Sequence, residues 1–484
     1  MKKRTFNIFY MVLLSGMLFL ITTRCVKLDE KPMDFVSPSN FYQSASQIEA
    51  AFASAMNRLY LYWGGYSWDP MDFENDDQYY GGTLVMSDSY GNNLWNWHYK
   101  SIADINPAIL ALSKDVLGTA ATQLEKDQLL AQAKFIRAYN YFVLVRLYGA
   151  VPLIAETTNL VTDEITRTPI KDVYALIESD LLFASQNLPV SWPAERRGRP
   201  SMDAAKVLLT KVYITMATAP LNEISNYTKA RDMAKQVMVA GTHYLVHDID
   251  QVFELANSYG PEMLWSFNAT PDDYSTEPQI YLPASMADGW GDIKPEVAWG
   301  VSFPEQPRKA AYLILEDWDG KPYTSFWWGG PGIRKFVYGS REDLENYLNI
   351  QNYSLIRYAE ALLIFAEAEN MVNNGPNQAA CDAVNQIIDR ANGYIQNPAD
   401  PRLTTALSKQ AFDDAVIQQR NWELCFEYDR WYDLVRKRIL KQKTAPEYQQ
   451  NFSENDYLYP IPQIDLRINP LLTQNPGYST PGSN

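Results

Sequence analysis

The chain has 484 residues, of which 46% are hydrophobic, 20% charged and 13% aromatic, and this composition excludes a disordered or collagen-like protein. Its formal net charge of −15 disfavours nucleic acid and anionic lipid head groups as partners. Three cysteines allow no disulfide framework, and three histidines without C-x-x-C or H-E-x-x-H argue against a metal site of the zinc type. The 32 tyrosines and 13 tryptophans suit either a Tyr-rich helical core or an aromatic surface displayed to a ligand.

The first 24 residues have the pattern of an export signal. A basic start, KKR, precedes an apolar run of 16 residues from Phe6 to Ile21, and Cys25 follows. The run is shorter than the about 20 residues that cross a bilayer, so we expect removal of residues 1–24 or lipidation at Cys25, and no transmembrane helix. Removal takes away four basic and no acidic residues and leaves residues 25–484 with a balance of −19.

Apolar residues at helical spacing predict a mainly α-helical protein. The sequence shows no βαβ alternation, no glycine-rich phosphate loop and no run of short, evenly spaced strands. Several predicted helices come in pairs with alanine-rich faces, which indicates tetratricopeptide-like pairs in a scaffold over about 41–257 and 341–440. The helices are expected over residues 47–62, 99–113, 131–148, 170–188, 204–217, 227–240, 353–372, 379–391 and 411–439.

Charged and sulfur-containing residues inside these helices are expected to be structural. Arg137 and Arg146 lie in a segment that is apolar nearly all round, where a buried guanidinium needs a carboxylate partner. Cys381 and Cys425 are expected to be small buried hydrophobes. The candidate partners of the two arginines are Glu360, Glu367, Glu427, Asp429 and Asp433.

Two loop-rich regions, residues 63–97 and 258–340, interrupt the helical pattern. The first holds four tryptophans and the second six, among Gly, Pro, Asp and Asn. Long loops within a domain are commonly functional, and disordered segments are depleted in aromatic residues. We therefore expect these regions to carry the ligand site, and an extended segment over 441–484 to end the chain.

Six separated motifs resemble the SusD/RagB family, the nutrient-uptake lipoproteins of Bacteroidetes outer membranes. The resemblance covers nearly the whole mature chain. The motifs are Cys25 with Leu28-Asp29 and Pro32, AKFIRAYNYFVLVRLYGAVPLI (133–154), GRPSMDAAKVLLTKVY (198–213), LIRYAEALLIFAEAEN (355–370), RNWELCFEYDRWYDLVR (420–436) and YLYPIPQIDLRINPLLTQNPGY (457–478).

The resemblance implies a single SusD-like domain over 25–484, with four tetratricopeptide-like helical pairs and a loop-rich region that carries the ligand site. It also implies a non-catalytic, lipid-anchored protein on the outer-membrane surface that sits on a SusC-like TonB-dependent transporter. The implied ligand is an oligosaccharide or, in the RagB branch, a peptide. Arg24 departs from the family pattern, which has a small residue before the lipidated cysteine, whereas Asp29-Glu30 resembles the surface-export signal.

Aromatic residues of the two loop regions are the candidates for ligand binding. The faces of sugar rings are rich in C–H groups, and an aromatic platform desolvates them while neighbouring polar groups orient the hydroxyls. Tryptophan suits this role because it buries much area with few rotamers to freeze. The alternative for each ring is that it fixes its loop to the helices. The candidates are Trp68, Asp69, Tyr79, Tyr80, Asn92, Trp95, Trp290, Trp318, Trp327 and Trp328.

The stretch TSFWWGGPGIRKF (324–336) allows a sharper prediction. Side chains of adjacent residues point in different directions, so one ring of the Trp327-Trp328 pair is expected to pack inward and the other to face a ligand. Glycines at 329, 330 and 332 let the backbone turn beside them. Residues 333–336 resemble the segment that leads back to the scaffold.

Three other functions remain open at this point: glycan hydrolysis, peptide capture and a protein scaffold. A glycosidase needs two carboxylates about 5 Å or about 6.5–9.5 Å apart, and the acidic residues of the first loop are the candidates for such a pair. Residues 72–76 could instead hold calcium, although they lack the glycine and terminal Glu of an EF-hand loop. We expect no other cofactor. The acidic candidates are Asp69, Asp72, Glu74, Asp76 and Asp77.

Overall fold

The computed structural model describes residues 41–63, 88–269, 278–346, 350–427, 429–443 and 449–480. The chain divides after Phe41, and all of the helices and strands named below belong to the unit Tyr42–Asn484. The expected signal segment 1–24 and Cys25 lie outside the described residues. Within the described ranges, no helix combines the length and the apolar character that a membrane crossing requires.

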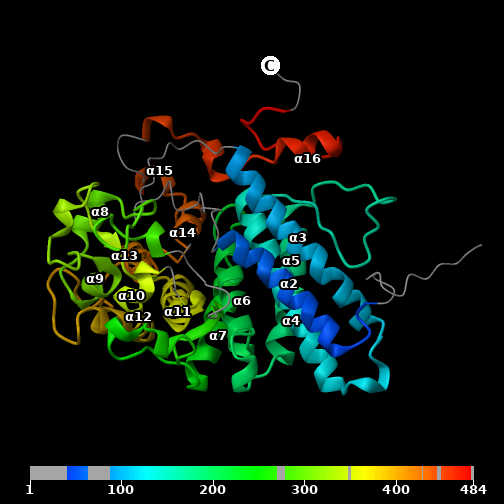
Figure 1. The fold of residues 1–484 in the computed structure, drawn as a ribbon, viewed down its shortest axis with the longest axis horizontal. Coiled ribbons are helices and arrows are strands. Elements are labelled where there is room, and N and C mark those ends of the chain that lie inside the picture. The colour runs from blue at the N-terminus through cyan, green and yellow to red at the C-terminus, as the bar shows by residue number, and fades with distance from the viewer. Residues whose placement is uncertain are drawn as a thin grey trace, which may run out of the picture. The chain divides into compact units, whose positions relative to one another are not determined.

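Helices dominate the unit, as the sequence predicts, and two small antiparallel sheets join them (Figure 1). Strand β1 (Met263–Phe267) pairs with β4 (Tyr353–Arg357), and β2 (Leu313–Ile314) pairs with β3 (Gly332–Ile333). The longer helices are α2 (Ala45–Trp63), α3 (Asp88–Ser113), α4 (Gln123–Tyr148), α5 (Ile170–Asn187), α6 (Met202–Met216), α7 (Asn226–Ala240), α11 (Tyr358–Val372), α12 (Gln378–Ala391), α13 (Lys409–Glu423) and α14 (Arg430–Arg436). The shorter ones are α8 (Val297–Ser302), α9 (Pro307–Tyr312), α10 (Arg341–Glu345), α15 (Leu440–Lys443) and α16 (Gln463–Ile468).

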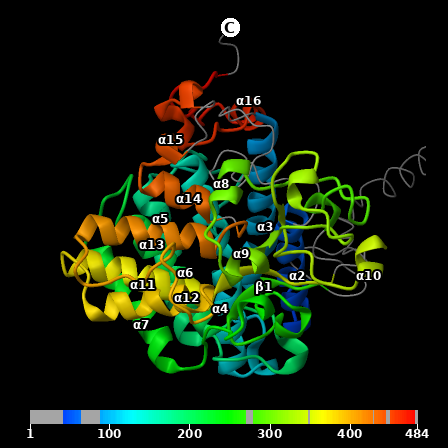
Figure 2. The ribbon, with the colours of Figure 1, turned by 90° about the vertical axis from the view of Figure 1, so that its left-hand side faces the viewer.

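Successive helices pack side by side in chain order, from α2 against α3 to α6 against α7. The stack continues from α7 to α11, although the insertion of residues 241–357 separates them in sequence, and α11 then contacts α12 and α13 (Figure 2). Helix α4 is apolar nearly all round because α2, α3, α5 and α6 all contact it. It begins at a capping box formed by Thr122 and Glu125 and ends at Gly149, whose φ is +72°.

The structure corrects several predicted boundaries, and helix α4, for example, begins at Gln123 instead of residue 131. Helix α3 begins at Asp88, so residues 88–97 of the predicted first loop region are helical. Residues 353–357 form β4 and not the start of a helix, because they pair with β1. The predicted helix 411–439 is broken after Glu423, where the Lys335 ammonium takes the main-chain oxygens of Glu423 and Cys425 at 2.8 and 2.9 Å.

Arg137 does not use the predicted partners, whereas the charge of Arg146 helps to lower the pKa of Asp429, one of the predicted carboxylates. Arg137 donates to Asp180 of α5 at 2.7 Å and to Glu156 at 2.5 Å. The Arg146 guanidinium lies 3.7 Å from the ring centroid of Phe142 and 3.3 Å from that of Tyr432. Cys381 and Cys425 are buried and form no disulfide, as expected.

A buried ion network joins the insertion to the scaffold. Glu423, at the end of α13, accepts from Arg390 at 2.7 Å and from Arg357 at 3.2 Å. Both arginines also bind Glu262, which precedes β1, and the insertion's Arg308 reaches Glu423 at 3.3 Å. Burial alone would raise the pKa of Glu423, but the surrounding arginines lower it to about 2. The insertion is thereby fixed to α12 and α13.

Candidate functional site

The candidate site lies on the short two-stranded ribbon that β2 and β3 form. The strand that returns to the scaffold is held because Lys335, two residues after β3, is fully buried and pairs with Glu427 at 2.8 Å. Ile333 and Phe336 are buried as well. Three of the residues 333–336 are thus buried and anchored, so the ribbon has a fixed base.

The ribbon carries Trp327 and Trp328 between its strands. The two rings meet edge to face at 85°, with centroids 5.5 Å apart. Trp327 is 65% exposed, whereas Trp328 is partly buried, packs against Phe326 with centroids 5.4 Å apart and donates from Nε1 to the Pro331 oxygen at 3.0 Å. One ring therefore packs inward and the other outward, as the sequence predicts.

Residues 290–294 lie next to the Trp327 and Trp328 rings and form one side of the candidate site. A Cβ at Gly291 would lie 2.6 Å from the Trp328 ring and 3.2 Å from Trp327 Nε1, and the φ of +59° at this position favours glycine. The Lys294 ammonium lies 4.6 Å from the Trp327 ring centroid, a cation–π distance. Trp290, the residue before Gly291, is 37% exposed.

A small hydrophobic cluster supports this surface. It consists of Leu282, Met286, Ile314 and Phe326, and Trp318 and Trp328 pack against it partly buried. The Arg341 guanidinium lies 4.6 Å from the Trp318 ring centroid. Of the four tryptophans that the sequence proposes in the insertion, Trp318 and Trp328 thus support the surface, Trp327 presents it, and Trp290 is exposed one residue before Gly291.

Polar groups lie beside the rings. Burial raises the pKa of Asp292, although Lys294 opposes the shift, and burial lowers the pKa of Lys294. Asp292 is only partly buried, so its carboxylate can accept hydrogen bonds from a ligand. An exposed aromatic face next to such groups can stack on a sugar ring and orient its hydroxyls.

Of the candidates in the first loop region, residues 63–97, the structure describes Trp95 and Asn92. Trp95 is 3% exposed and packs against Tyr99 and Tyr148, with ring centroids 4.8 and 5.0 Å away, so it belongs to the core and offers no ligand surface. The cause is the early start of α3, which places Trp95 on a helix face. Asn92 lies in α3. The other predicted residues of this region, Trp68, Asp69, Tyr79 and Tyr80, lie outside the described residues.

The acidic run 72–76, the candidate calcium site, also lies outside the described residues. Within the described ranges, no three His, Cys, Asp or Glu side chains gather to hold a metal ion. The sequence alone gives no local signal for Gly291, Asp292 or Lys294, because Gly291 meets the Trp327 and Trp328 rings only in the folded chain.

Two family models match the chain. Residues 36–214 match a family described as "Starch-binding associating with outer membrane", and residues 304–478 match the SusD family. Together the matches span both parts of the helical scaffold. The chain belongs to the SusD/RagB family. SusD-like proteins bind carbohydrates and are not catalysts.

Relatives over the full length agree with this membership. SusD-like protein P2 of Formosa agariphila is 28% identical, over 95% of this chain and 98% of its own length. The structure of a SusD superfamily protein from Parabacteroides distasonis has a TM-score of 0.77 at 25% identity, covering 90% of this chain and 99% of that one. A laminarin-binding SusD-like protein has a TM-score of 0.72 at 22% identity, covering 90% and 99%. The expected mainly helical, SusD-like fold is confirmed.

Proposed function

We propose that this SusD-like protein binds oligosaccharides at the cell surface and delivers them, chemically unchanged, to a SusC-like TonB-dependent transporter. The observation that carries the proposal is the Trp327 ring, which is 65% exposed and yet held between Trp328, Gly291 and Lys294. An aromatic face that is already fixed loses little entropy when a ligand binds.

Neutral glucans are the proposed ligand class. One matching family model is described as starch-binding, and one similar solved structure is a laminarin-binding protein. Starch and laminarin are both uncharged glucose polymers. A chain with a net charge of −15 repels acidic polysaccharides at long range and leaves neutral ones unaffected.

The proposal includes a subcellular location. Cys25 is the proposed lipid attachment site, and the mature protein would be held by it at the outer leaflet of the outer membrane. The transporter is proposed as the partner that takes over the bound oligosaccharide. Both elements rest on the family and on the sequence around Cys25.

Calorimetry of purified residues 25–484 with laminarihexaose and maltohexaose tests the binding. We expect saturable binding of one or both and no new reducing ends after prolonged incubation. Absence of binding to both would refute the glucan assignment, and new reducing ends would favour a hydrolase. Capture of the protein from detergent-solubilised outer membranes should bring down a TonB-dependent transporter, and recovery of bound peptides would favour the RagB-like alternative.

A further inference from the structure

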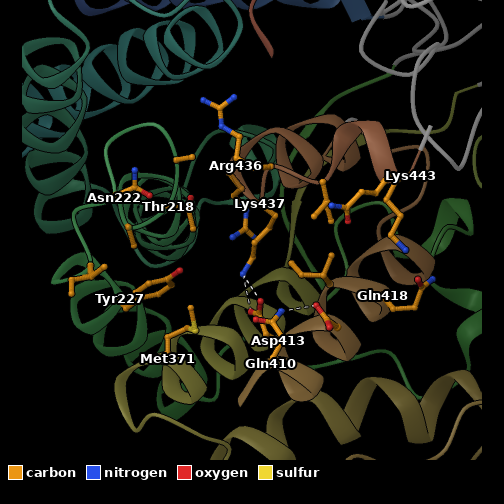
Figure 3. A pocket seen from close by; sticks show the side chains of 18 of the residues that line it. Thr218, Asn222, Tyr227, Met371, Gln410, Asp413, Gln418, Arg436, Lys437 and Lys443 are labelled. Carbon is orange, nitrogen blue, oxygen red and sulfur yellow. Dashed lines mark hydrogen bonds and ion pairs between the residues drawn. The ribbon is translucent and has the colours of Figure 1, made fainter. Parts of the chain in front are cut away.

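A cavity of about 650 Å³ lies within the helical scaffold. Its walls come from the α6–α7 link, α7, the end of α11, α13 and the segment from α14 to α15 (Figure 3). Its lining contains no residue of the insertion that carries the tryptophans. Small-molecule sites commonly have volumes of about 300–1,000 Å³, so this cavity has the size for a ligand of two or three sugar units.

The floor of the cavity is rigid and charge-balanced. The Lys437 ammonium lies 2.8 Å from each carboxylate oxygen of Asp413 and 2.8 Å from Glu367 (Figure 3). Glu367 also takes two hydrogen bonds from Arg436, at 2.6 and 2.7 Å. These four charges are paired with one another, so they shape the cavity. Ligand selectivity therefore depends on the other side chains that line it.

Uncharged hydrogen-bonding groups surround the open space. Tyr227 is 6% exposed, and its hydroxyl points into the cavity from the side opposite Lys443 and Gln418 (Figure 3). Within the described part of the chain this hydroxyl has no acceptor. The carboxamides of Asn222, Gln418 and Gln442 add donors and acceptors. Amide and phenol groups in this number match a ligand that carries many hydroxyls.

The excess charge of the lining is positive, opposite to that of the chain. Five cationic side chains and two carboxylates line the cavity, whereas the whole chain has a net charge of −15. Arg436 and Lys437 are balanced by Glu367, but Lys443 is exposed and has no carboxylate partner in the described ranges. Arg438 makes a 3.6 Å ion pair with the exposed Glu454, a kind of pair that contributes little, and its guanidinium lies 4.2 Å from the Tyr457 ring centroid.

We propose that this cavity is a second binding site, for an oligosaccharide of two or three units that carries an anionic group. Lys443 and Arg438 receive the carboxylate or sulfate, and Tyr227 and Gln418 bind hydroxyls of the adjoining unit. The site is separate from the Trp327 surface and does not depend on its function. An acidic sugar that the chain repels elsewhere is held at this one place by opposite charge.

Calorimetry with trigalacturonate, neocarrabiose 4-sulfate and maltotriose tests the proposal. The first two probes distinguish a carboxylate from a sulfate, and the third has no charge. We expect one acidic probe to bind at least about tenfold more tightly than maltotriose, and its affinity to fall as salt rises from about 50 to about 500 mM because the contact is partly exposed.

Two variants locate the site, and two others are controls. Lys443→Gln removes the unpaired charge and Tyr227→Phe removes only a hydroxyl, and each should weaken the acidic probe about three- to tenfold. Lys441→Gln changes the same charge on the same short helix but does not line the cavity, so it should have no effect. Trp327→Ala should likewise leave this binding unchanged.

Three results would overturn the proposal: no binding of either acidic probe, equal binding of maltotriose, or loss of binding in Trp327→Ala but not in Lys443→Gln and Tyr227→Phe. Thermal unfolding of each variant confirms that it is folded. Failure of laminarihexaose and maltohexaose to bind leaves this test intact, because the two experiments use different probes and different variants.

Discussion

Replacing Trp327 by Ala measures how much the exposed ring contributes to glucan binding. A Trp side chain buries about 150–250 Å² when fully covered. Trp327 is 65% exposed, so a sugar face that covers half of the exposed part removes roughly 50–80 Å² from water. At about 25 cal/mol per Å² this is about 1–2 kcal/mol, and the dissociation constant should rise about 5- to 30-fold.

The assay is calorimetric titration of laminarihexaose or maltohexaose, whichever the wild type binds more tightly. Trp327→Ala should leave the free energy of unfolding within about 0.5 kcal/mol of wild type, because the ring is mostly in solvent. Tyr244→Ala removes another exposed aromatic ring outside residues 278–340 and is the matched control. Equal affinities of wild type and Trp327→Ala would refute the role of the ring.

Single features of the chain support four further predictions. The pKa of Glu423 is lowered to about 2, against an ordinary value of 4.5, so its ionised form stabilises the fold fully above about pH 4.5. The thermal midpoint of unfolding should therefore fall as the pH drops from about 4.5 toward about 2, and a midpoint that does not change with pH would contradict this. Glu423→Gln leaves buried arginines uncompensated and should lower the free energy of unfolding, measured in urea, by about 3–5 kcal/mol. Gly291→Ala forces a Cβ against Trp328 at a positive φ, so it should cost about 1–3 kcal/mol of stability and weaken glucan binding, and unchanged values of both would refute the close approach. Cys25→Ala should move the protein from the membrane fraction to the soluble fraction, and continued membrane attachment would exclude a lipid anchor at this residue.

The helices could be predicted because their evidence is local. Helical spacing of apolar residues and the stop at Gly149 needed no knowledge of the rest of the fold. The partners of Arg137 could not be predicted, because spacing shows which face of a helix is buried but not which helix covers it. Asp180 of α5 binds Arg137 because α5 packs directly on α4, a fact of the tertiary structure.

The candidate site likewise has features that the sequence predicts and features that it does not. That one ring of the Trp327-Trp328 pair packs inward and the other outward was predictable because adjacent side chains diverge, but the sequence did not show which ring is which. Trp95 was not, because Gly91, Asn92 and Asn93 disfavour a helix on propensity alone, and tertiary packing overrides that preference in α3. Gly291 meets the Trp rings only in the folded chain, so its sequence neighbours could not reveal the contact.

The buried charges explain why the exposed ring can be rigid. Within the insertion, residues 258–340 form few long helices or strands, so hydrophobic burial alone would allow this loop-rich part to take several arrangements. Ion pairs are directional, and Glu423 is reached both from the insertion, by Arg308, and from the scaffold, by Arg390. A buried network of this kind adds little net stability compared with a hydrophobic core, but a shifted arrangement would leave charges unpaired at a cost of several kcal/mol. The network therefore selects one position for the ribbon that follows it, and with it one position for Trp327.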